Sequence, residues 1–129
     1  MEGFIMRVNP VAPCFRPISF DGIRSPLKSL DKCPCAYCGK MLYRERREYT
    51  IEHFFKTHKQ GGKASLSNTL ITCEPCNLYR GSQDLRTFLW KNPDIKANIY
   101  RYLDFMDGKI FDGMLYSKVI RDRMIRFRV

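Results

Sequence analysis

The sequence predicts an α+β fold, with a small core of two strands and a helix, an irregular N-terminal arm and C-terminal helices. Three observations predict it: a C-x-x-C pair at each end of one stretch, two short β-patterned segments between the pairs, and helical periodicity after the second pair. The core is expected over residues 32–90, after a basic arm over 1–31. A basic helical extension is expected over 91–129.

The size and charge of the chain limit the classes of protein to which it can belong. A chain of 129 residues suits one compact domain, and its 44% hydrophobic and 13% aromatic residues exclude global disorder. Lysine and arginine number 23 against 13 acidic residues, which gives a formal net charge of +10. So large an excess on a short chain predicts a polyanionic partner, and nucleic acid is the commonest polyanion.

The composition predicts neither a membrane protein nor an exported one. No stretch approaches the run of about 18 apolar residues that spans a bilayer, and residues 1–7 lack the apolar core of a signal peptide. Four of the six cysteines fall into C-x-x-C pairs, which favours reduced thiols that hold a metal over disulfides. The sequence therefore predicts a cytoplasmic, reducing location without an export signal.

The paired cysteines predict a structural zinc site. Two C-x-x-C turns joined by one supersecondary unit can supply four thiolates in a tetrahedron, and such a closed sphere is structural rather than catalytic. The predicted ligands are Cys35, Cys38, Cys73 and Cys76. Cys33 leaves an alternative open, because Cys33-Pro34-Cys35 offers a third nearby thiol that could replace Cys35.

Between the cysteine pairs, residues 48–53 are rich in β-formers and predict a strand, a glycine-containing loop turns the chain back, and residues 68–72 predict a second strand. After Cys76 the apolar spacing becomes helical, although Gly81 weakens the early turns of this helix. The apolar positions that predict it are Leu78, Leu85, Phe88 and Leu89.

Asn92 and Pro93 predict the start of a further helix, as an N-cap followed by proline at the first helical position. Its apolar face is expected to consist of Ile95, Ile99, Tyr102, Leu103 and Met106. It should end near Gly108. Residues 114–129 leave two readings open, because their apolar spacing fits a helix while the last five residues alternate as in a strand.

Several short motifs, taken in this order, resemble the HNH endonuclease family in its zinc-stapled, four-cysteine form. They are Glu52-His53, Gly61-Gly62, Asn68, Cys73-x-x-Cys76-Asn77 and Arg80-Gly81. The resemblance covers residues 33–85. It implies a ββα-metal unit, a β-hairpin and a helix around one divalent ion, and this agrees with the two strands and one helix predicted above.

The resemblance implies a metal-dependent DNA endonuclease that leaves 5′-phosphate and 3′-hydroxyl ends. His53 would be the general base, since an imidazole titrates near neutral pH. Glu52 and Asn77 would hold a catalytic Mg²⁺ or Mn²⁺, with water and phosphate completing the shell. Asn68 would bridge the hairpin loop and orient the base. Glu52 alternates to the opposite side of its strand from His53, so it would reach the ion only if the strand ends or twists there.

Basic residues near the motif are expected to contact phosphate, and the expected partner is double-stranded DNA. They are Lys63, Arg80, Arg44, Arg46 and Arg47. His58 reads as a loop residue. Cutting both strands with one active site per chain would favour a homodimer. The alternative function is a non-catalytic, zinc-stabilised module that binds nucleic acid or docks on a larger phage or bacterial assembly.

Overall fold

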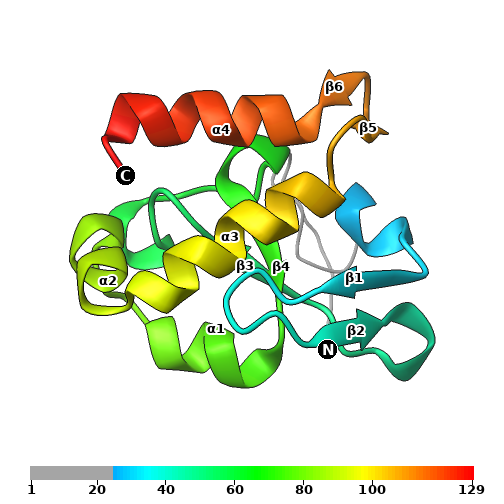
Figure 1. Ribbon diagram of the computed structural model, residues 1–129, viewed down its shortest axis with the longest axis horizontal. Coiled ribbons are helices and arrows are strands. Elements are labelled where there is room, and N and C mark those ends of the chain that lie inside the picture. Colours follow the sequence, from blue (N-terminus) through cyan, green and yellow to red (C-terminus); the bar gives the residue numbers. More distant parts are fainter. Residues whose placement is uncertain (1–24) are drawn as a thin grey trace.

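The computed structural model describes residues 25–129, and over these residues the fold is α+β, as predicted (Figure 1). Three separate two-stranded antiparallel sheets combine with four α-helices and short 3-10 turns. Of the predicted N-terminal arm, residues 1–24 lie outside the described part. None of the described helices has the length and apolarity needed to cross a bilayer.

The strands are short. They are β1 (Lys32–Pro34), β2 (Met41–Tyr43), β3 (Thr50–His53), β4 (Thr69–Thr72), β5 (Ile110–Phe111) and β6 (Met114–Leu115). The α-helices are α1 (Glu74–Arg80), α2 (Leu85–Lys91), α3 (Pro93–Phe105) and α4 (Tyr116–Phe127). The 3-10 helices are η1 (Pro26–Ser29), η2 (Arg44–Arg46), η3 (His58–Gln60) and η4 (Leu66–Asn68).

The central hairpin pairs β3 with β4, which confirms both strands predicted between the cysteine pairs. Its antiparallel register places Thr50 opposite Thr72 and His53 opposite Thr69. Every residue of β4 is buried, whereas Glu52 is the one buried residue of β3. The two ends of the hairpin therefore lie in different parts of the site. Thr50 and Thr72 lie at the end next to the cysteines, and His53 lies at the end next to the loop between β3 and β4.

A first hairpin, β1 with β2, was not predicted. It carries the turn of the first cysteine pair, closed by hydrogen bonds from the Cys35 N–H to the Lys40 carbonyl at 2.7 Å and from the Gly39 N–H to the Cys35 carbonyl at 2.9 Å. Gly39 has a φ of 81°, in the left-handed region that favours glycine. Three-residue strands are too short to give a recognisable alternation, so sequence periodicity could not show them.

The single helix predicted after Cys76 is two helices. The first of them, α1, already begins at Glu74, and it ends at Arg80, before the capping residue Gly81, whose φ is 55°. The second, α2, begins after Asp84, whose side chain accepts a hydrogen bond from the Thr87 N–H. Leu78, counted on the apolar face, is 74% exposed. The helix α1 has only two turns, too few to bury a broad apolar face, and its inward-facing positions carry polar side chains instead.

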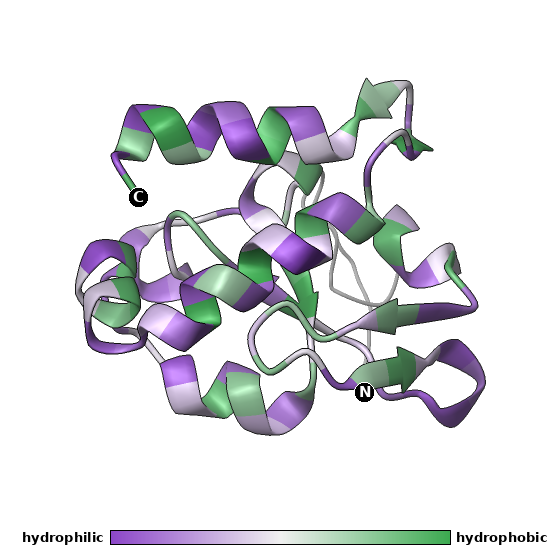
Figure 2. Ribbon diagram, in the orientation of Figure 1, coloured by the Kyte–Doolittle hydropathy of each residue, from purple (hydrophilic) through white to green (hydrophobic). Residues whose placement is uncertain are grey.

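The third helix is confirmed, with Ile99, Tyr102 and Leu103 buried along α3. The Asn92 side chain does not cap it as predicted but donates to the Phe88 carbonyl at the end of α2, at 2.8 Å. Residues 116–127 form the helix α4, which decides between the two open readings of the last segment. Figure 2 shows hydrophobic and hydrophilic residues alternating along α3 and α4, as expected for helices with one buried face.

Two buried tyrosines join the helices to the central hairpin. The Tyr102 hydroxyl accepts a hydrogen bond from the Ile71 N–H at 3.0 Å and lies 2.9 Å from the Tyr116 hydroxyl. Tyr116 in turn donates to the Thr69 carbonyl at 2.7 Å. Since Ile71 and Thr69 belong to β4, these bonds fix α3 and α4 against the strand that leads into the second cysteine pair.

Candidate functional site

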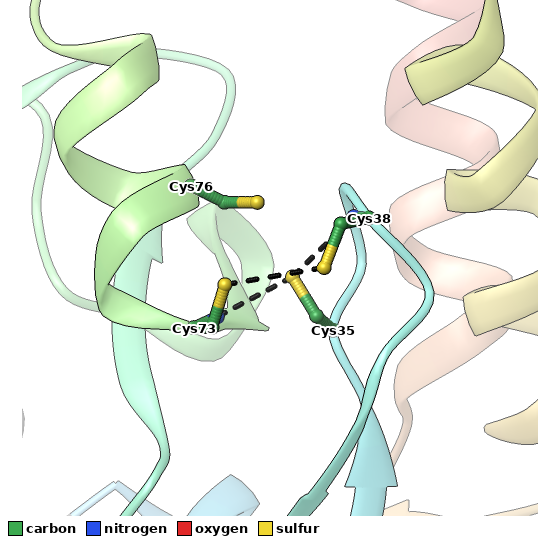
Figure 3. A group of neighbouring side chains, drawn as sticks. All are labelled: Cys35, Cys38, Cys73 and Cys76. Atoms are coloured by element: carbon green, nitrogen blue, oxygen red, sulfur yellow. Dashed lines mark hydrogen bonds between the residues drawn. The ribbon is translucent and has the colours of Figure 1, made fainter.

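Four cysteines form one cluster, and it contains the four predicted ligands. The Sγ atoms of Cys35, Cys38, Cys73 and Cys76 all lie within 4.8 Å of one another. Figure 3 shows the side chains converging from the β1–β2 turn and from the start of α1. Cys33 is buried outside this cluster, and its thiol donates to the Pro34 carbonyl at 3.4 Å. The structure therefore selects Cys35 over Cys33.

The surroundings of the cluster suit thiolates that share a cation. The Cys35 sulfur accepts hydrogen bonds from the Cys38 N–H at 3.5 Å and the Cys73 N–H at 3.3 Å. Without a cation, burial raises the pKa of Cys35, and burial together with the neighbouring sulfurs raises the pKa of Cys76. Four sulfurs at Zn–S distances of about 2.3 Å would lie about 3.8 Å apart. The Cys38 and Cys73 sulfurs are 4.0 Å apart. The cluster is thus positioned to hold a structural metal ion such as zinc.

His53 lies at the end of β3, where the strand passes into the loop. It is half-buried, and its ring lies edge-on to that of His58 with the ring centroids 5.9 Å apart. Burial and the neighbouring His58 lower the pKa of His53 from its ordinary value of 6.5. The imidazole is therefore neutral at neutral pH, and one of its ring nitrogens is free of a proton.

Asn68 organises the loop that follows His53. Its Oδ1 accepts from the N–H groups of Phe55 and Lys56, both at 3.0 Å. Its Nδ2 donates to the carbonyls of Lys56 and Lys63, both at 3.0 Å. The side chain is 5% exposed, so these bonds form away from bulk water. The loop-bridging contacts implied for Asn68 are thus present, and they fix the chain directly after His53.

Glu52 is not placed as the metal ligand that the resemblance implies. The residue is 4% exposed, and its Oε2 accepts from the Tyr37 hydroxyl at 2.6 Å and from Arg80 Nη1 at 3.2 Å. Burial raises the pKa of Glu52 to about 7, although Tyr37 and Arg80 both act to lower it. Mg²⁺ in proteins usually keeps several water ligands, whereas Glu52 is buried and its Oε2 is already bonded to two side chains.

The predicted trio of Glu52, His53 and Asn77 does not converge on one point. Thr50 and Glu52 project to one side of β3 and Ile51 and His53 to the other, because side chains alternate along a strand. The Asn77 Nδ2 lies 3.4 Å from both Thr50 Oγ1 and the Ile51 carbonyl, so Asn77 contacts the start of β3 rather than its end at His53.

The predicted phosphate-binding residues divide into two groups. Lys63, Arg44, Arg46 and Arg47 are exposed. Arg80 is 0% exposed, so the prediction that it contacts phosphate is wrong for this conformation. Besides Glu52, its guanidinium donates to the carbonyls of His53 at 3.3 Å, Phe54 at 3.0 Å and Gln83 at 2.9 Å. Arg80 is therefore an internal cross-link between α1 and the end of β3.

Sequence reasoning missed Tyr37, which lies within the first C-x-x-C turn and is fully buried. Its hydroxyl donates to Glu52 and accepts from Arg80 Nη1 at 3.1 Å. An aromatic residue inside a C-x-x-C turn was a signal for burial, but nothing in its position indicated the carboxylate as a partner.

A comparison with protein-family models, curated proteins and solved structures finds no match for this chain.

Proposed function

We propose that this protein hydrolyses phosphodiester bonds in DNA, with His53 as the general base, leaving 5′-phosphate and 3′-hydroxyl ends. The single observation that supports this most is the state of His53: a half-buried imidazole with a lowered pKa, at a strand end whose following loop is fixed by Asn68. A neutral imidazole in a defined orientation can take a proton from water as that water attacks phosphorus.

The loop after His53 supplies positive charge close to the base in the sequence. Lys56, Lys59 and Lys63 are all exposed on it, and Asn68 binds the backbone of two of them. Cations near a scissile phosphate offset the negative charge that develops in the transition state. We infer that substrate approaches from this side, where His53 is accessible, and not from the side on which Glu52 is enclosed.

A catalytic Mg²⁺ or Mn²⁺ was expected at Glu52 and Asn77. Glu52 does not fit such an ion, because the residue is buried and its Oε2 is already bonded to the Tyr37 hydroxyl and the Arg80 guanidinium. The proposal therefore assigns no step to a metal at this position. Hydrolysis should be measured in zinc-loaded protein with added Mg²⁺, with added Mn²⁺ and with neither, because the three rates separate a metal requirement from the action of His53.

The test compares His53→Ala with His58→Ala, a matched histidine variant from the same surface. Nicking of supercoiled plasmid and hydrolysis of bis(p-nitrophenyl) phosphate are followed, together with the zinc content and the circular dichroism of each protein. Loss of a general base is expected to lower both rates by about 10²–10⁴ for His53→Ala. The rates of His58→Ala should stay within about tenfold of the parent. Equal rates for the parent and His53→Ala would refute the assignment of the base.

A second function is supported by the enclosed Glu52, Tyr37 and Arg80. A carboxylate that serves only to hold an arginine is what a non-catalytic, zinc-stabilised DNA-binding module would contain. Such a module would bind DNA and leave supercoiled plasmid unchanged under all three metal conditions. The plasmid assay therefore decides between the two functions, provided that the protein is folded and zinc-loaded.

A further inference from the structure

A cleft of about 740 Å³ opens beside the cysteine cluster. Its lining includes Lys40, directly after the first cysteine turn, and residues 73–75 at the start of α1. It also includes Lys28, Leu42, Arg44 and residues 47–50. Lys28, Lys40, Arg44 and Arg47 line this space, and we call it the basic cleft. Its size is in the range of sites that bind small molecules, and larger than one phosphate requires.

The cations of the basic cleft differ in how they are engaged. Arg44 is engaged by Asp31 at 2.9 Å and by the Ser29 carbonyl at 3.0 Å. Within residues 25–129, neither Lys40 nor Arg47 makes a side-chain hydrogen bond or an ion pair. Two charged groups are therefore available to a ligand.

The backbone beneath these groups is fixed. Arg47 has a φ of 55°, and its N–H donates to the Arg44 carbonyl at 2.9 Å. Glu48, one of two carboxylates among the described residues that line the cleft, accepts from the Tyr43 N–H at 2.8 Å. The backbone that carries Arg47 and Glu48 is thus held in place at the cleft, which reduces the part of the chain that an anion would have to order on binding.

We propose that the basic cleft binds the phosphate backbone of double-stranded DNA. This inference rests on the proposed function, because both take DNA as the ligand, and it adds a binding site separate from His53. The lining favours a duplex over a single strand. Single-strand sites usually offer exposed aromatic rings on which bases stack. Among the described residues that line this cleft, Tyr49 is the one aromatic, and it is 7% exposed, with its hydroxyl donating to the Leu30 carbonyl at 2.7 Å.

The cysteine cluster would hold part of the lining in place. Lys40 follows Cys38 by two residues, and Cys73 itself lines the space, so both turns that meet at the cluster contribute to the cleft. The lining also includes Thr50, which lies at the other end of β3 from His53. Backbone bound in the cleft is thus held at the end of the hairpin that does not carry the base.

The experiment compares the charge reversal Lys40→Glu/Arg47→Glu with Arg86→Glu/Lys91→Glu, a control pair of exposed cations on α2 with the same change in net charge. The affinity for a fluorescent 20-base-pair duplex is measured by anisotropy between 50 and 200 mM salt, with the matching single strand in parallel. Zinc content and bis(p-nitrophenyl) phosphate hydrolysis are measured on each protein. The small diester cannot span the cleft and His53 together.

Two lost phosphate contacts should lower the slope of log affinity against log salt by about 1.8, which corresponds to about 60-fold weaker duplex binding at 0.1 M salt. The control pair should lose less than about a third of that slope. Unchanged duplex affinity, an equal loss in the control pair, or tighter binding of the single strand would each overturn the proposal. Hydrolysis of the small diester by the parent protein is measured separately from duplex binding, so a failure of the basic cleft is distinguishable from a failure of His53 catalysis.

Discussion

Replacement of Asn68 by alanine is expected to have the largest effect of any single polar substitution in the loop. The side chain makes four hydrogen bonds at 3.0 Å to the backbone of Phe55, Lys56 and Lys63. A net contribution of about 1 kcal/mol for each buried bond gives a loss of about 4 kcal/mol in the free energy of unfolding. That is a large fraction of the stability of a domain of this size.

Urea unfolding of the zinc-loaded protein measures this loss, and amide hydrogen exchange locates it. The Phe55 and Lys56 amides should lose protection in Asn68→Ala, because their acceptor is removed. Asn98→Ala is the matched control. Its Nδ2 makes one backbone bond, to the Tyr37 carbonyl at 2.8 Å, so a loss of about 1 kcal/mol is expected.

A loss in Asn68→Ala no greater than in Asn98→Ala would refute the reasoning, because it would mean that the loop does not depend on the bonds of Asn68. If His53 is the base, Asn68→Ala should also lower kcat for the small diester with little change in KM, since the loop after the base is loosened while the substrate contacts remain. Asn68→Asp keeps the two accepted bonds and places a carboxylate against two carbonyls. We expect its stability to be no better than that of the alanine variant.

Three further outcomes are expected. Chelation of the metal should unfold the region around the four-cysteine cluster, seen as lost near-ultraviolet circular dichroism, because structural zinc supplies about 10–16 kcal/mol in small domains. Arg80→Met leaves the Glu52 carboxyl buried without its cation and should cost about 3–5 kcal/mol in urea unfolding, whereas Glu52→Gln/Arg80→Met should recover part of that loss. The pKa of His53 is lower in the folded protein than its ordinary value of 6.5, so as the pH falls the unfolded chain takes up this proton before the folded protein does. The free energy of unfolding should therefore decrease as the pH drops from 6.5 through the folded pKa. His53→Gln should lack this part of the pH dependence, measured as the difference from the parent between pH 8 and 5.

Much of the fold followed from local patterns. The strands at residues 50–53 and 69–72, and the helix that begins at Pro93, carry periodicity or capping residues that act within a few positions. The break between α1 and α2 did not follow, because the helix pattern continues across Gly81 and the Asp84 cap stands inside it. The hairpin of β1 and β2 was missed for a similar reason, since three residues give too little alternation to read.

The cysteine cluster could be predicted because C-x-x-C spacing places two sulfurs on one turn, and two such turns can supply the four ligands of a tetrahedral site. The surroundings of Glu52 could not. The order of the motifs places Glu52 beside His53 in the sequence, but it does not predict which face of the strand is buried. Enclosure depends on Tyr37, 15 residues away, and on Arg80, 28 residues away. Contacts of that range are set by packing and leave no local pattern.

The buried Glu52–Arg80 pair and the proposed base are connected through the backbone. Arg80 Nη1 donates to the His53 carbonyl and is also bonded to Glu52 and the Tyr37 hydroxyl, while Nη2 donates to the Phe54 carbonyl. A guanidinium fixed by a carboxylate is a rigid donor, because its planar fork loses little further freedom on forming each bond. Glu52 therefore acts on His53 in this conformation as the anchor of Arg80. It follows that Arg80→Lys, which keeps the charge but loses the fork, should loosen the end of β3 even though the buried pair retains its opposite charges.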